Sequence, residues 1–347
     1  MGRIEFEVTR QACRFLDPTR GFEPVEKITE IRRDPLTGRT SHIVDTGFKA
    51  QRPDVERMVA QFRSGFNPFA PDKREEVTPR FMDEVEGIPG GRLSVGEALV
   101  VPNLFPYDRY SAVTVLSNAD FIPLDGFSED LLTDAFRADL AYLGRVRERE
   151  GEELRHYSVN WNYMPLAGGS LVHPHHQLIA SPVPTSYLRD VEDGLGQYGG
   201  DYFRDLVKAE EGGERWVGCE GGISWLTGFA PLGHIDIVGV FEGRVSLFDL
   251  TDEDVRALAR ALLRVFDYLH TENFASFNSS LYGLEGADDF TVHYRLSPRF
   301  LLSNELGTSD VNYFEIGHSE SLAFFYPEAA ASGLRGRFSA SERGVSR

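Results

Sequence analysis

The chain has 347 residues, 41% hydrophobic and 26% charged, a length and composition typical of a globular protein with a substantial core. Its formal net charge of −18 excludes a broad nucleic-acid surface, which needs clustered Lys and Arg, but not a small anion held by local cations. With no apolar run long enough to span a membrane, no secretory leader at the N-terminus and two cysteines, we expect a cytoplasmic protein without disulfides.

The elements are predicted in chain order as follows. Residues 64–91 are rich in Pro, Gly and charge and are expected to form a loop. Residues 96–117 predict two strands around a turn. Ser128, followed by acidic residues, predicts a helix N-terminus, and Thr251 predicts a second one. Residues 192–214, with Gly and acidic clusters, are expected to link two units, and the tail is expected to fray from about residue 339.

A weak internal repeat joins these elements. Each predicted helix precedes strand-like sequence that contains an asparagine and then a histidine strand. The spacing from Ser128 to His173 is 45 residues, and that from Thr251 to His293 is 42. The sequence therefore predicts a duplicated α+β unit, with Arg295 in the second copy where the first has His175. We expect one functional site per chain, in the first copy.

The candidate site is the segment "AGGSLVHPHHQLIASP", residues 167–182. If it contains a strand, side chains alternate, so His173, His175 and Gln177 share one face and His176 points away. Pro174 requires an edge or strand-end position, because proline cannot donate to a sheet ladder. Two imidazoles and an amide on one face suit a phosphate held for attack by a histidine.

The turn before this strand can add to the site. Gly168 and Gly169 permit a backbone turn whose N–H groups can face an anion, and Ser170 adds a hydroxyl. Two other interpretations remain open from the residues alone. His173 and His175 could be two ligands of a zinc ion, although no further His, Cys and acid cluster completes the set, or the histidines could be satisfied core residues.

Four stretches together resemble one family. "NYMPLAGGSLVHPHHQLIASP" (162–182) is similar to the active-site signature of the galactose-1-phosphate uridylyltransferases, a branch of the histidine-triad superfamily, with its HPHxQ motif and upstream asparagine. "IRRDPLTGRTSHIVDTGFKAQRP" (31–53), "VVPNLFP" (100–106) and "PEAAASGLR" (327–335) resemble further motifs of that family. The resemblance extends from about residue 25 to 337 and implies two histidine-triad-like halves, each an antiparallel sheet with packed helices, at residues 1–191 and 192–347.

The resemblance implies a nucleotidyltransferase. His175 would attack the α-phosphorus of a nucleoside diphosphate sugar, giving a covalent nucleotidyl-histidine that a second, phosphorylated small molecule then attacks. Gln177 would donate to the transferring phosphoryl group, with His173 beside it. A site completed at a homodimer interface and a place in galactose metabolism are further implications. No cofactor is implied. The substrate- and nucleotide-binding positions would be Lys49, Arg52, Asn103, Phe105, Asn162, Gly168, Gly169, Ser170, Tyr313, Phe314 and His318.

Departures from the family pattern concern metals and the sugar. Zinc-containing members have CxxC where this chain has residues 67–70 (Asn-Pro-Phe-Ala), and their zinc histidine is Asp120 here. In the second metal site His293 persists, but Tyr282 and Arg295 replace histidines. We therefore expect no structural metal. The sugar-recognition motif is most similar to residues 313–319, with Ser319 at the carboxylate position, so the chemistry is expected to be retained and the substrate changed.

Two alternatives to the transferase stay open. One is a phosphorylase, in which inorganic phosphate accepts the nucleotide, as in relatives that act on ADP-glucose or dinucleoside polyphosphates. The other is a nucleotide-binding protein without turnover. The residues name neither the base nor the sugar.

Overall fold

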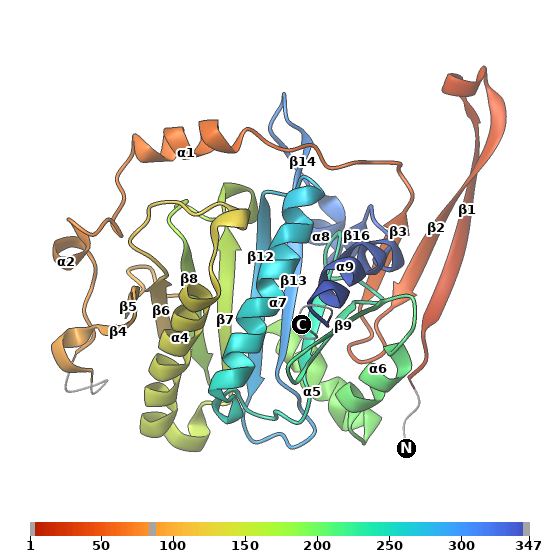
Figure 1. Ribbon diagram of the computed structural model, residues 1–347. Coiled ribbons are helices and arrows are strands. Elements are labelled where there is room, and N and C mark those ends of the chain that lie inside the picture. Colours follow the sequence, from red (N-terminus) through yellow and green to blue (C-terminus); the bar gives the residue numbers. More distant parts are fainter. Residues whose placement is uncertain (1–3, 83–87, 343–347) are drawn as a thin grey trace.

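The computed structural model describes residues 4–82 and 88–342, and a ten-stranded antiparallel sheet forms its centre (Figure 1). The strand order is β4-β5-β6-β8-β7-β12-β13-β11-β10-β9. The second half of this order repeats the first in reverse, which confirms the predicted duplication and the α+β class. The strands are β4 (Leu93–Val95), β5 (Ala98–Pro102), β6 (Tyr110–Val115), β7 (His156–Tyr163), β8 (His175–Ser181), β9 (Trp216–Glu220), β10 (Ile223–Thr227), β11 (Ile237–Phe241), β12 (Ser276–Leu284) and β13 (His293–Arg299).

The two halves meet at β7 and β12 and form one continuous sheet rather than two separate ones. These strands pair antiparallel, with Trp161 opposite Ser279. On either side of this pair the neighbouring strands repeat one register: Gln177 lies opposite Asn160, and Ser297 lies opposite Asn278. His175 and Arg295 are therefore equivalent positions in space, as the sequence repeat predicts.

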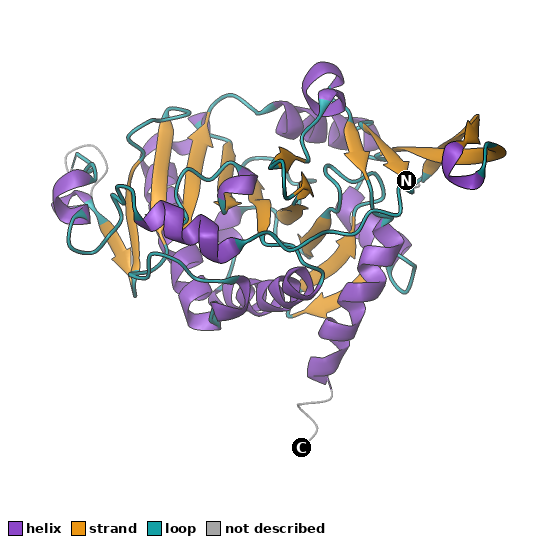
Figure 2. Cartoon of the chain, turned by 90° about the horizontal axis from the view of Figure 1, so that it is seen from above, coloured by secondary structure: helices purple, strands orange, loops and turns teal. Residues whose placement is uncertain are grey.

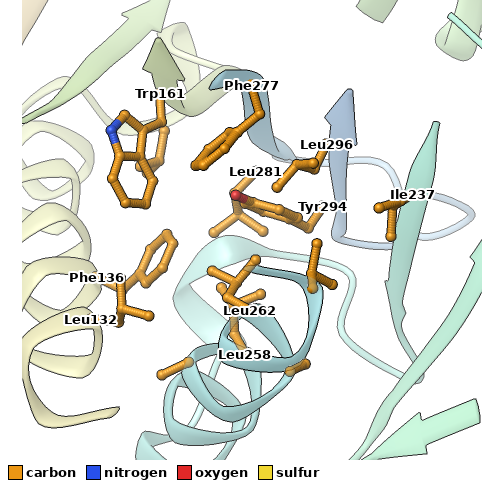
Figure 3. Packing of buried hydrophobic residues seen from close by; sticks show 14 of the residues in the cluster. Leu132, Phe136, Trp161, Ile237, Leu258, Leu262, Phe277, Leu281, Tyr294 and Leu296 are labelled. Atoms are coloured by element: carbon orange, nitrogen blue, oxygen red, sulfur yellow. The ribbon is translucent and has the colours of Figure 1, made fainter. Parts of the chain in front are cut away.

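Two long helices cover one face of this sheet (Figure 1). They are α4 (Glu129–Glu150) and α7 (Asp252–Thr271), and they begin where predicted. The Ser128 side chain accepts from the Leu131 N–H, and Thr251 forms a capping box with Asp254. Their apolar faces pack against the sheet in one buried cluster (Figure 3), which includes Leu132, Phe136, Leu258 and Leu262 from the helices and Trp161, Phe277, Leu281, Tyr294 and Leu296 from the strands.

A second, smaller sheet has the order β1-β2-β3-β16. Its strands are β1 (Glu7–Asp17), β2 (Glu23–Arg33), β3 (Thr40–Val44) and β16 (Ser321–Ala323), the last running parallel to β3. The N-terminal segment is thereby attached to the C-terminal part of the chain. The ribbon of β1 and β2 extends away from the body (Figures 1 and 2).

Three sequence expectations need correction. The proposed linker, residues 192–214, is largely helical, and the expected boundary at 191/192 falls inside α5. Within 64–91 there is a short helix, while residues 83–87 lie outside the described part. The tail is helical to residue 342.

The remaining elements are α1 (Val55–Arg63), α2 (Arg74–Val77), α5 (Ser186–Tyr198), α6 (Tyr202–Glu210), β14 (Leu301–Ser303), β15 (Thr308–Ser309), α8 (Tyr313–His318) and α9 (Pro327–Glu342). Among the described residues, no helix combines the length and apolar character needed to cross a bilayer.

Candidate active site

The candidate site lies at the start of β8, where β8 runs between β6 and β7. His175 is the first residue of the strand and pairs with Val115 of β6. Pro174 directly precedes the strand, and its carbonyl accepts from the Leu116 N–H at 3.0 Å. The expectation of a strand-end position is therefore confirmed, whereas an edge position is wrong because β8 is an interior strand.

His175 is held in one tautomer by the backbone. Its Nδ1 lies 2.8 Å from the carbonyl oxygen of His173. A carbonyl can only accept, so Nδ1 carries the proton and Nε2 keeps its lone pair. The side chain is 6% exposed and its ring lies against that of Phe69, with centroids 5.4 Å apart. Burial lowers the pKa of His175 to about 4, which keeps the imidazole neutral at pH 7.

The side chain of His173 is fully occupied by protein partners. Its Nε2 donates to the Ser117 carbonyl at 2.8 Å, and its Nδ1 accepts from the Asn67 side-chain amide at 3.0 Å. Burial lowers the pKa of His173 below its usual value. Both nitrogens of the imidazole are thus occupied by the protein and are not free for a substrate. His173 contributes to the site through its backbone carbonyl, which orients His175.

The positions that would form the family's first metal site come together but do not suit a metal. The Asn67 side-chain amide donates a hydrogen bond to His173 Nδ1, so the lone pair that a metal would need is occupied. Asp120 is held by two hydrogen bonds from Arg63, each 2.8 Å, and these lower the pKa of its carboxyl. Within the described ranges, no group of three His, Cys, Asp or Glu side chains is placed to hold a metal ion.

His176 points to the opposite face of the sheet, as predicted. Its Nδ1 lies 2.7 Å from the carboxylate of Asp139 on α4, and both side chains are buried. The same carboxyl group accepts from the Thr114 hydroxyl of β6 at 2.5 Å. This polar network fixes β8 to α4 directly behind His175.

Two asparagines of β7 lie beside β8 on the site face. Asn160 pairs with Gln177, and its amide donates to the Gln177 carbonyl at 3.2 Å and to the Ser158 hydroxyl at 2.8 Å. Continuing this register places Asn162 opposite His175. The side-chain oxygen of Asn162 accepts from the Asn278 amide of β12 at 2.7 Å. The sequence analysis did not identify Asn160. Its position two residues before Asn162 places both side chains on one strand face, and this spacing could have indicated it.

The glycine turn before β8 differs from its prediction. The N–H of Gly168 donates to the Pro165 carbonyl at 2.9 Å, and that of Gly169 donates to the Met164 carbonyl at 3.3 Å. These two donors are therefore engaged within the turn rather than directed at an anion. Gly168 has φ +84°, and a Cβ at Gly169 would lie 2.8 Å from the Asn162 carbonyl, so both positions require glycine. Ser170 is exposed.

The predicted nucleoside residues form the loop between β5 and β6. The side-chain oxygen of Asn103 accepts from the Phe105 N–H at 3.0 Å, and the Phe105 ring is 75% exposed. Asn103 also bonds to Ser111, which pairs with Ile179, four residues beyond His175. At about 3.3 Å per residue this loop lies roughly 13 Å along the sheet from His175.

The other predicted binding residues lie elsewhere in the same chain. Arg52 contacts the His270 ring at the end of α7, at 2.8 Å, and Lys49 is exposed. Tyr313, Phe314 and His318 belong to α8, which packs against β16. Residues of α8 also line a cavity of about 370 Å³ beside β13, in the C-terminal half.

In that half the position equivalent to His175 is occupied by a paired arginine. Arg295 forms an ion pair with Asp236 and donates to the Tyr187 hydroxyl at 2.9 Å. Tyr187 in turn contacts His293 Nε2 at 3.0 Å, and His293 Nδ1 donates to the Thr291 carbonyl. Of the two equivalent strand starts, β8 alone carries a histidine whose Nε2 has no partner within the described residues.

The ten-stranded sheet and the position of HPHHQ (173–177) define a duplicated α+β protein with a histidine-rich segment at the start of an interior strand. A scan of protein-family models gives no match. An uncharacterized protein of Archaeoglobus fulgidus is 30% identical over 322 residues, which cover 91% of this chain and 94% of that protein, and the chain belongs to the same family as that protein.

Solved structures share the fold at lower identity. An ADP-glucose phosphorylase from Arabidopsis thaliana, with bound ADP-glucose, has a TM-score of 0.69 and 18% identity, with 88% of this chain and 98% of that chain covered. A galactose-1-phosphate uridylyltransferase-like protein of the same plant has a TM-score of 0.66 and 18% identity, with 88% of this chain and 98% of that chain covered. A uridylyltransferase has a TM-score of 0.62 and 20% identity, with 89% of this chain and 98% of that chain covered. The predicted resemblance is confirmed for the fold.

Proposed function

We propose that the chain is a nucleotidyltransferase that moves a nucleoside monophosphate from a nucleoside diphosphate sugar to a phosphorylated small molecule through His175. The observation that carries this proposal is the 2.8 Å bond from His175 Nδ1 to the His173 carbonyl, which leaves Nε2 unprotonated in a buried, neutral imidazole. Nε2 forms a bond to the α-phosphorus while the bond to the bridging oxygen breaks. The sugar phosphate leaves with that electron pair, and no proton has to be transferred from the nucleophile.

The neighbours of His175 support the same chemistry. Gln177 lies two residues along the same strand face, and its side-chain amide donates to a non-bridging oxygen of the transferring group. An amide cannot release a proton, so it does not help water to act as the acceptor. Asn162 and Ser170 hold the phosphates, and Asn103 and Phe105 hold the nucleoside. The intermediate therefore waits for a phosphate acceptor.

A homodimer completes the site in this proposal. Lys49 and Arg52 correspond to phosphate-binding positions of the resembled family, but in one chain Arg52 contacts His270 instead. Tyr313, Phe314 and His318 of α8 likewise lie in the C-terminal half. A second copy brings such residues to His175, which agrees with the strong exposure of Tyr313.

The acceptor differs from galactose 1-phosphate. Ser319, at the position of the sugar-binding carboxylate, is the C-cap of α8 with φ +55°, and Glu315 is engaged in the capping box of the same helix. A buried carboxylate discriminates sugar epimers because a mismatch leaves it unpaired at a cost of about 1–3 kcal/mol. Without it, we expect weak discrimination between galactose and glucose. The same observation favours the second candidate, a phosphorylase with inorganic phosphate as acceptor.

One time course separates the functions. The protein is incubated with a panel of nucleotide sugars that includes ADP-glucose and UDP-glucose, alone, with phosphate, or with a sugar phosphate. Intact mass and peptide mapping detect an adduct of one nucleoside monophosphate on His175. Release by a sugar phosphate indicates the transferase, and release by phosphate as nucleoside diphosphate indicates the phosphorylase. Binding without an adduct indicates the protein without turnover.

The controls use two buried histidines. His175→Ala should abolish the adduct. His293→Ala removes an equally buried imidazole with the same type of backbone bond in the other half, and should still form it. An adduct on His173 or His176, or turnover in His175→Ala, would contradict the assignment of the nucleophile.

A further inference from the structure

The turn formed by residues 67–70 lies against the start of β8. The ring of Phe69 contacts the imidazoles of His173 and His175, with ring centroids 5.8 Å and 5.4 Å apart. Phe69 is buried and belongs to a small apolar cluster with side chains of β5 and β6. The turn is therefore packed against strands of the main sheet and has a fixed place beside the candidate nucleophile.

The side-chain amide of Asn67 makes two hydrogen bonds that fix its orientation. One end of the amide lies 3.1 Å from the N–H of Phe69. Because a backbone N–H can only donate, this end has to be the oxygen, and the NH₂ group then faces His173 Nδ1 at 3.0 Å. One side chain therefore bonds both to the backbone of Phe69, whose ring covers His175, and to the imidazole of His173.

Asn67 sets the tautomer of His173. Since the amide donates, His173 Nδ1 has to accept, and the proton of the neutral ring is on Nε2, which donates to the Ser117 carbonyl at 2.8 Å. The segment that carries this carbonyl is itself held, because one oxygen of Glu97 accepts from the Ser117 hydroxyl and from the Asn118 N–H, each at 3.0 Å. The imidazole of His173 is thus fixed at both nitrogens by groups from two separate segments.

The backbone at His173 in turn orients His175. The carbonyl of His173 accepts from His175 Nδ1 at 2.8 Å, and the next carbonyl, that of Pro174, accepts from the Leu116 N–H at 3.0 Å. The backbone before His175 is therefore supported on one side by the fixed side chain of His173 and on the other by the residue that follows β6. Release of the His173 ring removes one of these two supports and weakens the bond that keeps His175 Nε2 unprotonated.

We propose that Asn67 is the positioning residue of the candidate nucleophile and that it acts through His173 and Phe69. The positions of the first metal site do not fit a metal here, and the amide orders His173 in its place. A reacting side chain keeps a productive geometry when its supporting residues are themselves fixed by hydrogen bonds and packing, as Asn67 is. The role of His175 as nucleophile rests on the proposed function, whereas the tautomers that Asn67 sets are measurable without any substrate.

Two substitutions at Asn67 separate its donor from the rest of the side chain. Asn67→Asp keeps the size and the oxygen that accepts from the Phe69 N–H, but a carboxylate cannot donate to His173. Asn67→Ser keeps an acceptor for the same N–H without adding a charge, and its shorter side chain ends before the imidazole. The matched control is Asn273→Asp, the same change at an exposed asparagine after the end of α7.

The imidazole tautomers are measured in the free protein. Long-range ¹H–¹⁵N spectra of the natural chain should show the proton of His173 on Nε2 and that of His175 on Nδ1. In both Asn67 variants we expect His173 to lose its single neutral tautomer and His175 to show a mixture of the two. Asn273→Asp should give the spectrum of the natural chain. Circular dichroism shows which variants are folded, and Asn67→Ser decides if Asn67→Asp is not.

The rate of adduct formation is the second readout. A misplacement of about 1 Å at a reacting group costs up to about 100-fold in rate, so the maximal single-turnover rate should fall by about 10- to 100-fold in both Asn67 variants. The concentration of nucleotide sugar at half saturation should stay nearly unchanged, because Asn67 acts on the nucleophile and not on the ligand. A variant that is only less stable would lower the melting temperature and keep both values.

Three results would overturn the proposal. They are a single Nδ1–H tautomer of His175 in the folded Asn67 variants, an unchanged maximal rate in those variants, and a proton or a metal ion on His173 Nδ1 in the natural chain. If no nucleotide sugar forms an adduct with the natural chain, the proposed function fails, and the tautomers of the free protein still decide on Asn67. The two proposals therefore fail separately.

Discussion

The protonation of His175 gives the sharpest prediction, and the perturbation is pH. Burial lowers the pKa of this imidazole to about 4. At pH 5.5 such a group is about 97% neutral, whereas a histidine with an ordinary pKa of about 6.5 is only about 9% neutral. If neutral Nε2 is the nucleophile, the rate of adduct formation should be nearly the same at pH 7.5 and 5.5. An ordinary histidine would lose about tenfold in rate over that interval.

The assay needs two readouts. Single-turnover mass spectrometry follows the adduct, and the long-range ¹H–¹⁵N spectrum of the free protein reports the tautomer without any substrate. We expect the Nδ1–H form, because the His173 carbonyl accepts from that nitrogen. The signals are assigned by their loss in His175→Ala. An apparent pKa near 6.5, or a proton on Nε2, would refute the reasoning.

The same shift has a consequence for stability. When a folded-state pKa lies below the unfolded value, the unfolded chain binds the proton first, so stability falls as pH decreases from about 6.5 toward 4. For His175 the loss is about 3 kcal/mol over that range, an order-of-magnitude figure at 1.36 kcal/mol for each pKa unit. His175→Ala should show a shallower acid dependence of its unfolding free energy than the natural chain. Equal slopes would contradict the buried neutral imidazole.

Three further predictions concern the surroundings of the site. Asp139→Ala leaves His176 buried without its acceptor, and chemical denaturation should show a loss of about 3–5 kcal/mol; a change below about 1 kcal/mol would contradict a buried pair. Asn67→Ala removes the donor to His173 Nδ1 and should lower the free energy of unfolding by about 1–3 kcal/mol. The purified protein should hold far less than one equivalent of zinc or iron, and a chelator should leave its melting temperature unchanged; stoichiometric zinc on His173 would count against this.

Local signals allowed the helices and the site strand to be predicted. Ser128 and Thr251 cap their helices through bonds to residues three positions away, so their effect is contained in a few adjacent letters. The alternation along β8 likewise places His175 and Gln177 on one face. The helix caps and the strand alternation depend only on the spacing of residues in the sequence. They therefore do not change with the way the elements pack, as long as each element forms.

The errors arose where tertiary packing decides. Gly194 and its neighbours suggested a linker, yet Gly194 lies inside α5. A Cβ there would come within 2.2 Å of the Leu36 carbonyl oxygen, so the helix needs glycine at this point of contact. This glycine permits close packing rather than flexibility. The glycine turn at Gly168 was expected to present free N–H groups, but its donors are bonded to carbonyls that only the folded turn brings near. Leu36 is remote in the sequence from Gly194, whereas Pro165 and Met164 lie only three and five residues before the glycines that bond to them.

The second half has Arg295 at the position equivalent to His175, yet its residues contact the candidate site. Arg299 is held by Asp310 and donates to the side-chain oxygen of Asn278 at 3.0 Å. That bond fixes the Asn278 amide so that its nitrogen donates to the oxygen of Asn162 at 2.7 Å. With its oxygen occupied, Asn162 keeps its NH₂ group for another partner, and in the proposed function that partner is a phosphate. Because β7 and β12 belong to one continuous sheet, the orientation of the Asn162 side chain depends on the Arg299–Asp310 ion pair, which lies three strands from β8. The duplication therefore persists in the chemistry of the site, although only one of its two copies retains the histidine.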